Sequence, residues 1–318
     1  MKKVLITGIT GQDGLFLTNK LIETYKGVEI IGITRQRNSY SFFRNLERFK
    51  ISNKNIKLLN LNLSNPEAVD KLIYEFVPDA VFNLSGPSSV YESIQNPKQA
   101  EEILSIFKNI TNSLIKHKNF CKFYQASSSE MFGNTITKLN ENSIFLPNSP
   151  YAEAKLKNHK SCKFLREKYD WEIFSGIMFN HESEFRSNNF LIMKIINGAL
   201  KIKSKDADKL IIGSLELIRD WSYAKDTIEG VHSLITEGKE FDYIIASGKS
   251  YKIEDIVDIV FSYLNLNWKN YVEVDQAILR DGDSSHRIAN IEKITNHTSW
   301  RPETTVEEML EIMITKKI

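Results

Sequence analysis

Short apolar segments alternate with amphipathic ones between residues 2 and 179, and this alternation restricts the chain to few folds. The apolar segments lie at 2–8, 28–34, 56–62, 79–85, 121–127 and 171–179. Helical patterns between them include 65–76, 97–117 and 149–169, the last with Ser149 as N-cap and Pro150 as first helical residue. Strands separated by such helices form parallel sheets that are covered on both faces. The sequence therefore predicts an α/β fold with a doubly wound parallel sheet.

The composition fits an intracellular protein of one large or two modest domains. The 318 residues carry a net charge of +2 with lysines and acids interspersed, so no nucleic-acid partner is expected. The two cysteines, Cys121 and Cys162, predict neither a disulfide framework nor a zinc site. The apolar run near Met1 ends at Thr7, too early for a signal peptide, and no segment is long enough to span a membrane. We expect a cytoplasmic protein without a bound metal.

Three glycines follow the first predicted strand in TGITGQDG, residues 7–14. Gly8 allows a tight turn, Gly11 lets the backbone approach a diphosphate, and Gly14 lets the next helix pack closely. A glycine pattern alone is weak evidence, but between a first strand and a first helix it favours a dinucleotide cofactor over a simple turn. The predicted sheet is therefore of the Rossmann type.

The end of the second predicted strand indicates which dinucleotide binds. An acidic residue there accepts a hydrogen bond from the ribose 2′-hydroxyl of NAD, whereas arginine suits the 2′-phosphate of NADP. This chain reads GITRQR at 32–37, with Arg35 and Arg37 and no acid. NADP is the predicted cofactor, and ordinary solvated arginines are the alternative interpretation.

Tyr151 and Lys155 lie four residues apart in YAEAK, on one face of the helix predicted at 149–169. A free phenol has a pKa of about 10 and is a poor base at neutral pH. A nearby ammonium group and the positive nicotinamide ring are expected to lower the pKa of Tyr151 toward a useful range. Such a pair often arises by chance, but downstream of a dinucleotide loop it predicts proton transfer from a sugar hydroxyl.

The predicted strand 121–127 runs into the sequence SSEMFG, which brings Ser127, Ser128, Ser129 and Glu130 to the rim of the sheet. These residues form either a turn with solvated hydroxyls or an active site in which Glu130 moves a proton.

After Phe179 the alternation weakens into short strands, polar loops and helices near 225–237, 253–264 and 304–315. We expect residues 1–179 to form the NADP-binding domain, joined by later segments at about 215–248. Residues 180–318 are expected to form mostly a smaller, mixed α/β lobe that binds the substrate. The basic stretch 201–209 is predicted to be a solvated loop.

Motifs along nearly the whole chain resemble the extended short-chain dehydrogenase/reductase family, and within it the GDP-mannose 4,6-dehydratase group of nucleotide-sugar enzymes. The motifs are ITGITGQDG (6–14), FYQASSSEMFG (123–133), SPYAEAKL (149–156), MFNHES (178–183), RDWSYAKD (219–226) and WRPETTVEEM (300–309). FNHES and QASSSE weigh most, because they separate this group from other sugar-nucleotide epimerases and reductases. The resemblance implies a lyase that converts a GDP-sugar, either GDP-mannose or a hexose or heptose variant, to the 4-keto-6-deoxy sugar.

The resemblance also implies four catalytic residues. Ser128 would bond the sugar O4, and Tyr151 would deprotonate it while hydride passes from C4 to NADP. Lys155 would hold the ribose and lower the pKa of Tyr151. Glu130 would remove the C5 proton, after which water leaves C6 and the hydride returns there, so that NADP is regenerated in each turnover.

Binding residues follow from the same resemblance. Cofactor contacts are implied for Gly8, Thr10, Gly11, Gln12, Asp13, Gly14, Arg35, Asn62, Leu63, Leu84, Ser85, Ser88, Tyr151, Lys155, His181 and Arg186. Substrate contacts are implied for Ser88, Ser128, Glu130, Asn180, Lys194, Arg219, Arg280 and Asp283. Arginines there suit bidentate binding of phosphate. For Lys194 a snorkelling side chain is an equal alternative, and Trp221 is expected in the core.

Four positions depart from the pattern of the group. Asn62 stands where the group usually has aspartate, next to the adenine. In NLSGPSSV (83–90), Pro87 and Ser89 replace glutamine and histidine, and Asp283 replaces a glutamate further on. The last three positions belong to the expected hexose pocket. They suggest a GDP-sugar altered at C2 or C6, such as an N-acetylated hexose or a heptose.

Two alternatives use the same fold. A GDP-sugar 4-reductase, 4-dehydrogenase or epimerase would share Tyr151 and Lys155 but would not need Glu130 as a base. A non-catalytic NADP-binding regulatory protein would need none of the three, and the retained set disfavours it. We also expect a homodimer or homotetramer, because the group forms them through the loop after the second strand. The aromatic residues of 35–45 suit such contacts, with local packing as the alternative.

Overall fold

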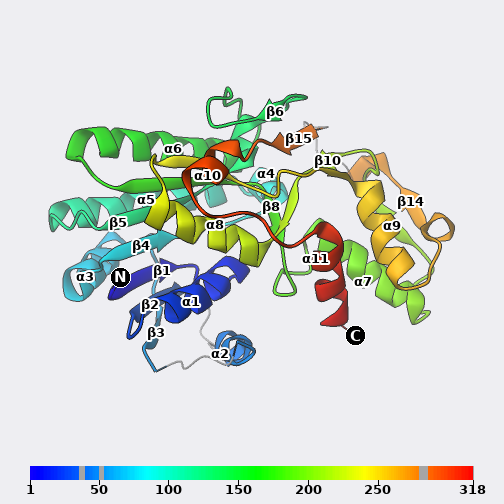
Figure 1. Ribbon diagram of the computed structural model, residues 1–318, viewed down its shortest axis with the longest axis horizontal. Coiled ribbons are helices and arrows are strands. Elements are labelled where there is room, and N and C mark those ends of the chain that lie inside the picture. Colours follow the sequence, from blue (N-terminus) through cyan, green and yellow to red (C-terminus); the bar gives the residue numbers. More distant parts are fainter. Residues whose placement is uncertain (36–39, 50–53, 279–285, 318) are drawn as a thin grey trace.

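The computed structural model describes residues 1–35, 40–49, 54–278 and 286–317, so Arg37, Arg280 and Asp283 lie outside the described residues. A parallel sheet of seven described strands forms its larger part, in the order β12-β7-β5-β4-β1-β2-β3 (Figure 1). These strands are β1 (Lys3–Thr7), β2 (Glu29–Thr34), β3 (Ile56–Asn60), β4 (Ala80–Asn83), β5 (Lys122–Ser128), β7 (Ile173–Met178) and β12 (Asp242–Ile245). The order runs outward from β1 and β4 in both directions, which confirms the predicted doubly wound α/β fold.

Helices cover both faces of this sheet, because successive strand residues point to opposite faces. In β1, Val4 and Ile6 join one buried cluster and Leu5 joins the other. Helices α1 and α8 pack against the first face, and α3, α5 and α6 against the second (Figure 1). Their bounds are α1 (Gln12–Thr24), α3 (Pro66–Phe76), α5 (Lys98–Lys116), α6 (Pro150–Tyr169) and α8 (Ala224–Glu237).

A smaller lobe of short elements lies to one side of the large sheet, at the right in Figure 1. Its four-stranded sheet has the order β13-β10-β15-β6, with an antiparallel β10–β13 pair and parallel β10–β15 and β15–β6 pairs. The remaining strands pair as β11–β8 and β14–β9. The strands are β6 (Lys138–Leu139), β8 (Asn180–Glu182), β9 (Leu210–Ile212), β10 (Ile218–Arg219), β11 (Trp221–Tyr223), β13 (Tyr251–Lys252), β14 (Val272–Val274) and β15 (His286–Ala289). The helices of the lobe are α7 (Leu191–Lys203), α9 (Ile253–Tyr263) and α11 (Val306–Thr315), with short 3₁₀ turns η2 (Trp268–Asn270) and η3 (Gln276–Ile278). Helix α10 (Glu292–His297) instead packs against β12 and α8 of the larger part (Figure 1).

Local signals account for several boundaries. Helix α6 begins as predicted: Pro150 is its first residue, and the Ser149 side chain accepts a hydrogen bond from the Ala152 N–H at 3.2 Å. Trp221 is buried, as expected. The stretch 201–209 is only partly a loop, because α7 continues to Lys203.

The structure also contains elements that the sequence pattern does not predict, namely α2 (Tyr40–Glu47), α4 (Val90–Gln95) and the 3₁₀ helix η1 (Ser129–Phe132). In α2, Phe42 is buried and packs within its own chain, whereas Tyr40 is 70% exposed. The local-packing alternative therefore holds for Phe42. All three elements are short, and the expected periodicities need longer windows to be recognised.

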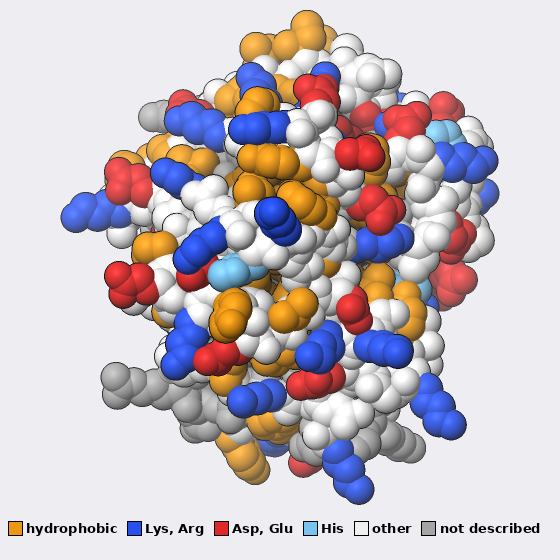
Figure 2. All heavy atoms as spheres, turned by 90° about the vertical axis from the view of Figure 1, so that its left-hand side faces the viewer, with side chains coloured by type: hydrophobic (Ala, Val, Ile, Leu, Met, Phe, Trp, Pro, Cys, Tyr) orange, Lys and Arg blue, Asp and Glu red, His pale blue; other side chains and the backbone are white. Residues whose placement is uncertain are grey.

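Charges of both signs are interspersed over the face that Figure 2 shows. Within the described ranges, no helix has both the length and the apolarity needed to cross a membrane. The same residues include no group of three or more His, Cys, Asp or Glu side chains that could hold a metal ion.

Candidate active site

The predicted site residues follow the carboxyl ends of the central strands. The glycine loop follows β1, Arg35 follows β2, Asn62 follows β3, and Leu84 and Ser85 follow β4. Ser128 ends β5, and the Asn180–His181 pair begins β8 directly after β7. In open parallel sheets, ligands bind at this edge, where the strand order reverses. Here the reversal lies between β1 and β4.

The glycine loop fits a diphosphate. Gly8 has φ +70°, which favours glycine, and a Cβ on Gly14 would lie 2.4 Å from the Ile9 Cα. A Cβ on Gly11 would meet only the Gly8 carbonyl oxygen, at 3.4 Å, so there is open space beside this residue. Gly11 also caps α1 without a side-chain hydrogen bond to its first amides. The N-terminus of α1 is therefore open to an anion, which its dipole favours.

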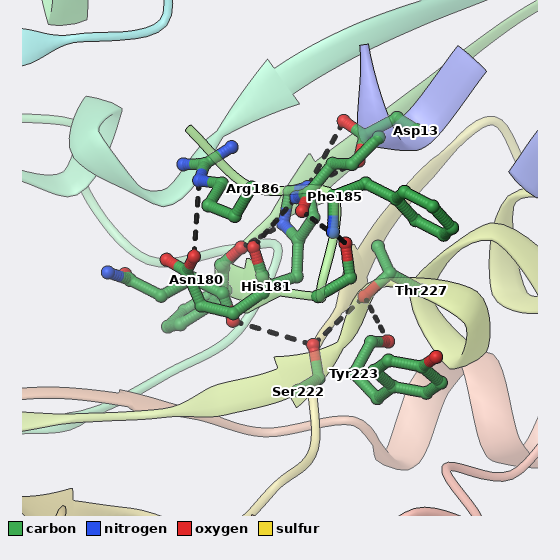
Figure 3. A network of polar contacts seen from close by, with 12 residues as sticks. Asp13, Asn180, His181, Phe185, Arg186, Ser222, Tyr223 and Thr227 are labelled. Carbon is green, nitrogen blue, oxygen red and sulfur yellow. Dashed lines mark hydrogen bonds and ion pairs between the residues drawn. The ribbon is translucent and has the colours of Figure 1, made fainter. Parts of the chain in front are cut away.

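Gln12 and Asp13 bond to β8 and the residues beside it (Figure 3). The Gln12 Nε2 donates to the His181 carbonyl at 2.9 Å, and the Gln12 Oε1 accepts from the Ser183 hydroxyl at 2.8 Å. The His181 Nε2 lies 3.1 Å from both carboxylate oxygens of Asp13. Burial opposes charge on both groups, but their mutual attraction prevails, so the pKa of Asp13 is lowered and that of His181 is raised. Gln12 and Asp13, both predicted cofactor residues, thus also hold the start of α1 against β8 by hydrogen bonds.

Figure 3 shows Arg186 and Asn180 beside this network. The Arg186 Nε forms an ion pair with Glu182 at 3.2 Å, and its guanidinium carbon lies 3.4 Å from the Phe190 ring centroid. The carbonyl oxygen of Asn180 accepts a hydrogen bond from Ser222 at 3.5 Å. Within the described part of the chain, the Asn180 side chain makes no hydrogen bond, which leaves its amide available to a ligand.

A cavity of about 510 Å³ lies at the ends of β2 and β3, lined by Arg35, Asn62, Ser64, Lys98, Glu101, Glu102 and Ser105. Arg35 and Asn62, the residues predicted for the adenosine end of NADP, thus share one cavity. The Arg35 Nη1 donates to the Glu102 carboxylate at 2.6 Å, and the Asn62 Oδ1 accepts from the Ser64 N–H at 3.0 Å. Sequence reasoning missed Glu102, which no motif marks.

Tyr151, Lys155 and Ser128 form a buried group. The Lys155 Nζ donates to the Ala126 carbonyl at 2.8 Å and lies 5.6 Å from the centroid of the Tyr151 ring. Burial raises the pKa of Tyr151 to about 12, and a hydrogen bond from Ser128 opposes this. Burial likewise lowers the pKa of Lys155 to about 8. The pKa of Tyr151 is therefore raised in this arrangement and not lowered as expected beside Lys155 and a nicotinamide ring, because burial disfavours the phenolate.

All three serines at the end of β5 are buried, so the alternative of a turn with solvated hydroxyls is wrong. The Ser127 hydroxyl lies 2.8 Å from the Ser175 hydroxyl and 3.3 Å from the His159 Nδ1, inside the fold. The Ser128 hydroxyl accepts from the Glu130 N–H at 3.2 Å and so starts η1.

Glu130 forms an ion pair with Arg287 of β15. Arg287 is 1% exposed and belongs to no motif, so sequence reasoning assigned it nothing. It lies 157 residues from Glu130, and only the pairing of β15 with β10 and β6 brings it to the site.

The other predicted substrate residues are more widely distributed. Arg219 is buried next to Arg287 in the β10–β15 pair, and its Nη1 donates to the Ile218 carbonyl. Lys194 is exposed on α7, and Ser88 is exposed before α4. The Ser89 hydroxyl caps α4 by accepting from the Glu92 N–H at 3.1 Å.

Comparison with known proteins identifies the family. The family model of the GDP-mannose 4,6 dehydratases matches residues 5–313. GDP-mannose 4,6 dehydratase 2 of Arabidopsis thaliana is 33% identical over 322 residues, which cover 98% of this chain and 86% of the relative. The GDP-mannose 4,6-dehydratase of Yersinia enterocolitica is 30% identical over 351 residues, which cover 99% and 93%.

The fold is also similar to the crystal structure of dTDP-glucose 4,6-dehydratase from Bacillus anthracis in complex with NAD. The TM-score is 0.85 at 18% identity, covering 100% of this chain and 96% of that one. This similarity shows the Rossmann-type fold alone. The family match and the relatives, however, span nearly the whole chain and confirm the predicted enzyme class, a hydro-lyase. The chain belongs to the GDP-mannose 4,6-dehydratase family.

Proposed function

We propose that the chain is an NADP-dependent 4,6-dehydratase that converts a GDP-sugar to its 4-keto-6-deoxy derivative. One observation carries this proposal: Ser128, Tyr151 and Lys155 form a single buried group, and Glu130 follows directly at the rim of the sheet. A 4-reductase, 4-dehydrogenase or epimerase would use the first three without a base for C5. The presence of Glu130 beside them favours dehydration.

Each of these side chains has one task in the proposed reaction. The Ser128 hydroxyl bonds the sugar O4, and Tyr151 takes the O4 proton as C4 becomes a ketone. The ammonium of Lys155 stabilises the phenolate. The ketone acidifies the C5 proton, and Glu130 accepts this proton and passes it to the C6 hydroxyl, which leaves as water. When the hydride adds to C6, C5 takes up a proton from solvent, and Tyr151 releases the O4 proton to solvent, so the net loss is one water. NADP, when bound, supplies the acceptor for the C4 hydride and returns this hydride to C6, so the cycle needs no external oxidant.

The choice of NADP rests on the residues around its expected site. Gly11 leaves space for the diphosphate at the N-terminus of α1, and Arg35 shares a cavity with Asn62. The other cofactor contacts predicted from the family resemblance are proposed together with these residues. Because Glu102 pairs with Arg35, we expect a 2′-phosphate to displace this carboxylate.

Replacing Arg35 tests the choice of cofactor. Arg35→Ala removes the charge-assisted hydrogen bonds to the 2′-phosphate, so NADP binding should weaken about tenfold or more while NAD binding changes little. Calorimetric titration of both dinucleotides measures this. An equal loss for NAD and NADP would contradict the assignment of Arg35 to the 2′-phosphate.

The sugar is proposed to be mannose or a hexose or heptose variant of it. Ser88, Asn180, Lys194 and Arg219 remain the proposed substrate contacts, together with Arg280 and Asp283 outside the described residues. The Ser89 side chain caps α4, at the position where the group usually has a histidine. A panel of GDP-, CDP-, UDP- and dTDP-sugars read by mass spectrometry identifies the substrate.

Organisation and setting complete the proposal. Residues 1–179, with about 215–248, form the cofactor-binding domain, and 180–318 form mostly the substrate lobe.

A homodimer or homotetramer is supported by the exposed Tyr40 on α2, and light scattering measures the mass. A cytoplasmic location is supported by Cys121 and Cys162, which are both free thiols.

The reaction itself is tested without added cofactor. Purified protein with GDP-mannose and related sugars should give a product lighter by one water, with no net change in NADPH. A stoichiometric change in NADPH would instead support the reductase or dehydrogenase alternative. Protein that binds NADP but turns over no nucleotide sugar would support the regulatory alternative.

Glu130→Gln tests the base. C4 oxidation should survive, whereas loss of water should fall roughly 10²–10⁴-fold, because no carboxylate accepts the C5 proton. Mass spectrometry measures the product, and NADPH fluorescence measures C4 oxidation. The matched control is Glu229→Gln, which removes a surface carboxylate paired with Lys20 and should leave the rate unchanged. Normal dehydration by Glu130→Gln would remove Glu130 from this role.

A further inference from the structure

Arg287 is a buried cation that the proposed mechanism does not use. Its residue is 1% exposed, and a charge so deeply buried is costly unless a partner of opposite charge lies beside it. The partner in the structure is Glu130, through an ion pair from the Arg287 Nη1. The Arg287 Nε has no hydrogen-bond partner among the described residues. Among the described residues, the carboxylate that the Arg287 guanidinium contacts is therefore that of Glu130.

Both ends of this ion pair are fixed by backbone contacts. Arg287 pairs with Arg219 in the β10–β15 register, and its carbonyl accepts from the Asp220 N–H at 3.2 Å. Glu130 is held in η1, where its N–H donates to the Ser128 hydroxyl. The backbones of both partners are thus held, and the ion pair orients the Glu130 carboxylate between them.

Other titratable and charged side chains lie on the elements that surround the pair. Helix α6, packed on η1, contributes Tyr151 and Lys155, and Lys155 donates to the Ala126 carbonyl. The small sheet contributes Arg219 of β10, His286 of β15 and Lys138 of β6. Asp220 follows Arg219 in the sequence, and its carboxylate already accepts hydrogen bonds from Ser247 and Gly248.

We infer that Arg287 is a positioning residue for the dehydration: its ion pair fixes the Glu130 carboxylate at the rim of the sheet, where the C5 proton is removed. This inference rests on the proposed role of Glu130. A general base acts only from within hydrogen-bond reach of the proton that it removes, so the orientation of the carboxylate matters to the rate. Arg287 itself exchanges no proton, because a guanidinium stays charged throughout the working range of pH.

The test compares Arg287→Met, which removes the charge, with Arg287→Lys, which keeps it. Without its ion-pair partner, the Glu130 carboxylate is free to turn away from the C5 proton. The kcat for water loss should therefore fall tenfold or more in Arg287→Met, with KM nearly unchanged. Arg287→Lys should lose less, because it keeps the charge without the two-pronged geometry of the guanidinium. C4 oxidation, read by NADPH fluorescence, should survive in both variants. An equal loss of C4 oxidation and of water loss, or an unchanged rate of water loss in Arg287→Met, overturns the inference.

Two further measurements keep the outcomes separate. Deuterium incorporation at C5 in heavy water reports the action of Glu130: if Glu130→Gln leaves it intact, the proposed role of Glu130 fails. The melting temperature of Arg287→Met relative to the double variant Glu130→Gln/Arg287→Met needs no substrate. Arg287→Met should melt at the lower temperature of the two, because it leaves the Glu130 carboxylate without its partner, and equal melting temperatures would contradict the ion pair. If Arg287→Met does not fold, Arg287→Lys decides: we expect a lower kcat for water loss with C4 oxidation retained, and an unchanged kcat overturns the inference.

Discussion

Lys155 carries its charge at a place where burial disfavours it. Burial lowers its pKa from 10.5 to about 8, so the folded protein binds this proton less tightly than the unfolded chain does. The charge of Lys155 therefore destabilises the folded state to its full extent below about pH 8. This destabilisation disappears as the pH rises toward 10.5. Such a cost at a site residue is typical of functional rather than structural charges.

Lys155→Met tests this cost. The free energy of unfolding of the variant should exceed that of the wild type by at most about 3 kcal/mol at pH 7. This gain in stability should shrink by pH 10. Its activity should be lost. Urea unfolding at the two pH values measures the difference. A gain equal at both values would mean that the burial of the charge is not its source.

At the scale of the element, helix α6 places Tyr151 in its first turn, two residues after the N-cap Ser149. The Ser149 hydroxyl accepts from the Ala152 N–H, and the Asn65 side chain caps α3 in the same way, accepting from Glu67 and Ala68. α3 carries none of the proposed site residues, so the two caps form a matched pair.

Ser149→Ala and Asn65→Ala should each lower the free energy of unfolding by about 1 kcal/mol. Only Ser149→Ala should also lower kcat, because fraying of the first turn of α6 displaces Tyr151. Thermal denaturation and initial rates measure the two effects. An equal kcat in both variants would show that the first turn of α6 is held by its packing and not by its cap.

At the scale of the whole molecule, Asp220 connects the small sheet to the edge of the large one. It lies between β10 and β11 and accepts hydrogen bonds from Ser247 and Gly248, which follow β12. Burial raises its pKa from 3.8 to about 7, although these hydrogen bonds oppose the shift. A raised pKa in the folded state contributes stability at low pH that is lost as the pH rises to about 7.

Asp220→Asn removes this titration. The free energy of unfolding of the wild type, relative to the variant, should fall by up to about 3 kcal/mol between pH 5 and pH 8. Chemical unfolding of both proteins across this range measures it. A difference independent of pH would mean that Asp220 stays charged at both ends of the range.

The alternating pattern, the glycine loop and the start of α6 could all be predicted from the sequence, because each depends on residues within a few positions of one another. Gly8, Gly11 and Gly14 determine the turn and the approach of α1 by their lack of a side chain. The family motifs, likewise contiguous, predicted the group to which the chain belongs.

Only the tertiary structure decided which charges meet. His181 pairs with Asp13 from 168 residues away, Glu130 with Arg287 from 157, and Arg35 with Glu102 from 67. It also decided that burial raises the pKa of Tyr151. Desolvation and long-range pairing depend on what packs around a group, and no local pattern records this. The sequence by itself therefore determined the fold and the residues offered to the site, and the packing determined their partners and their readiness to exchange protons.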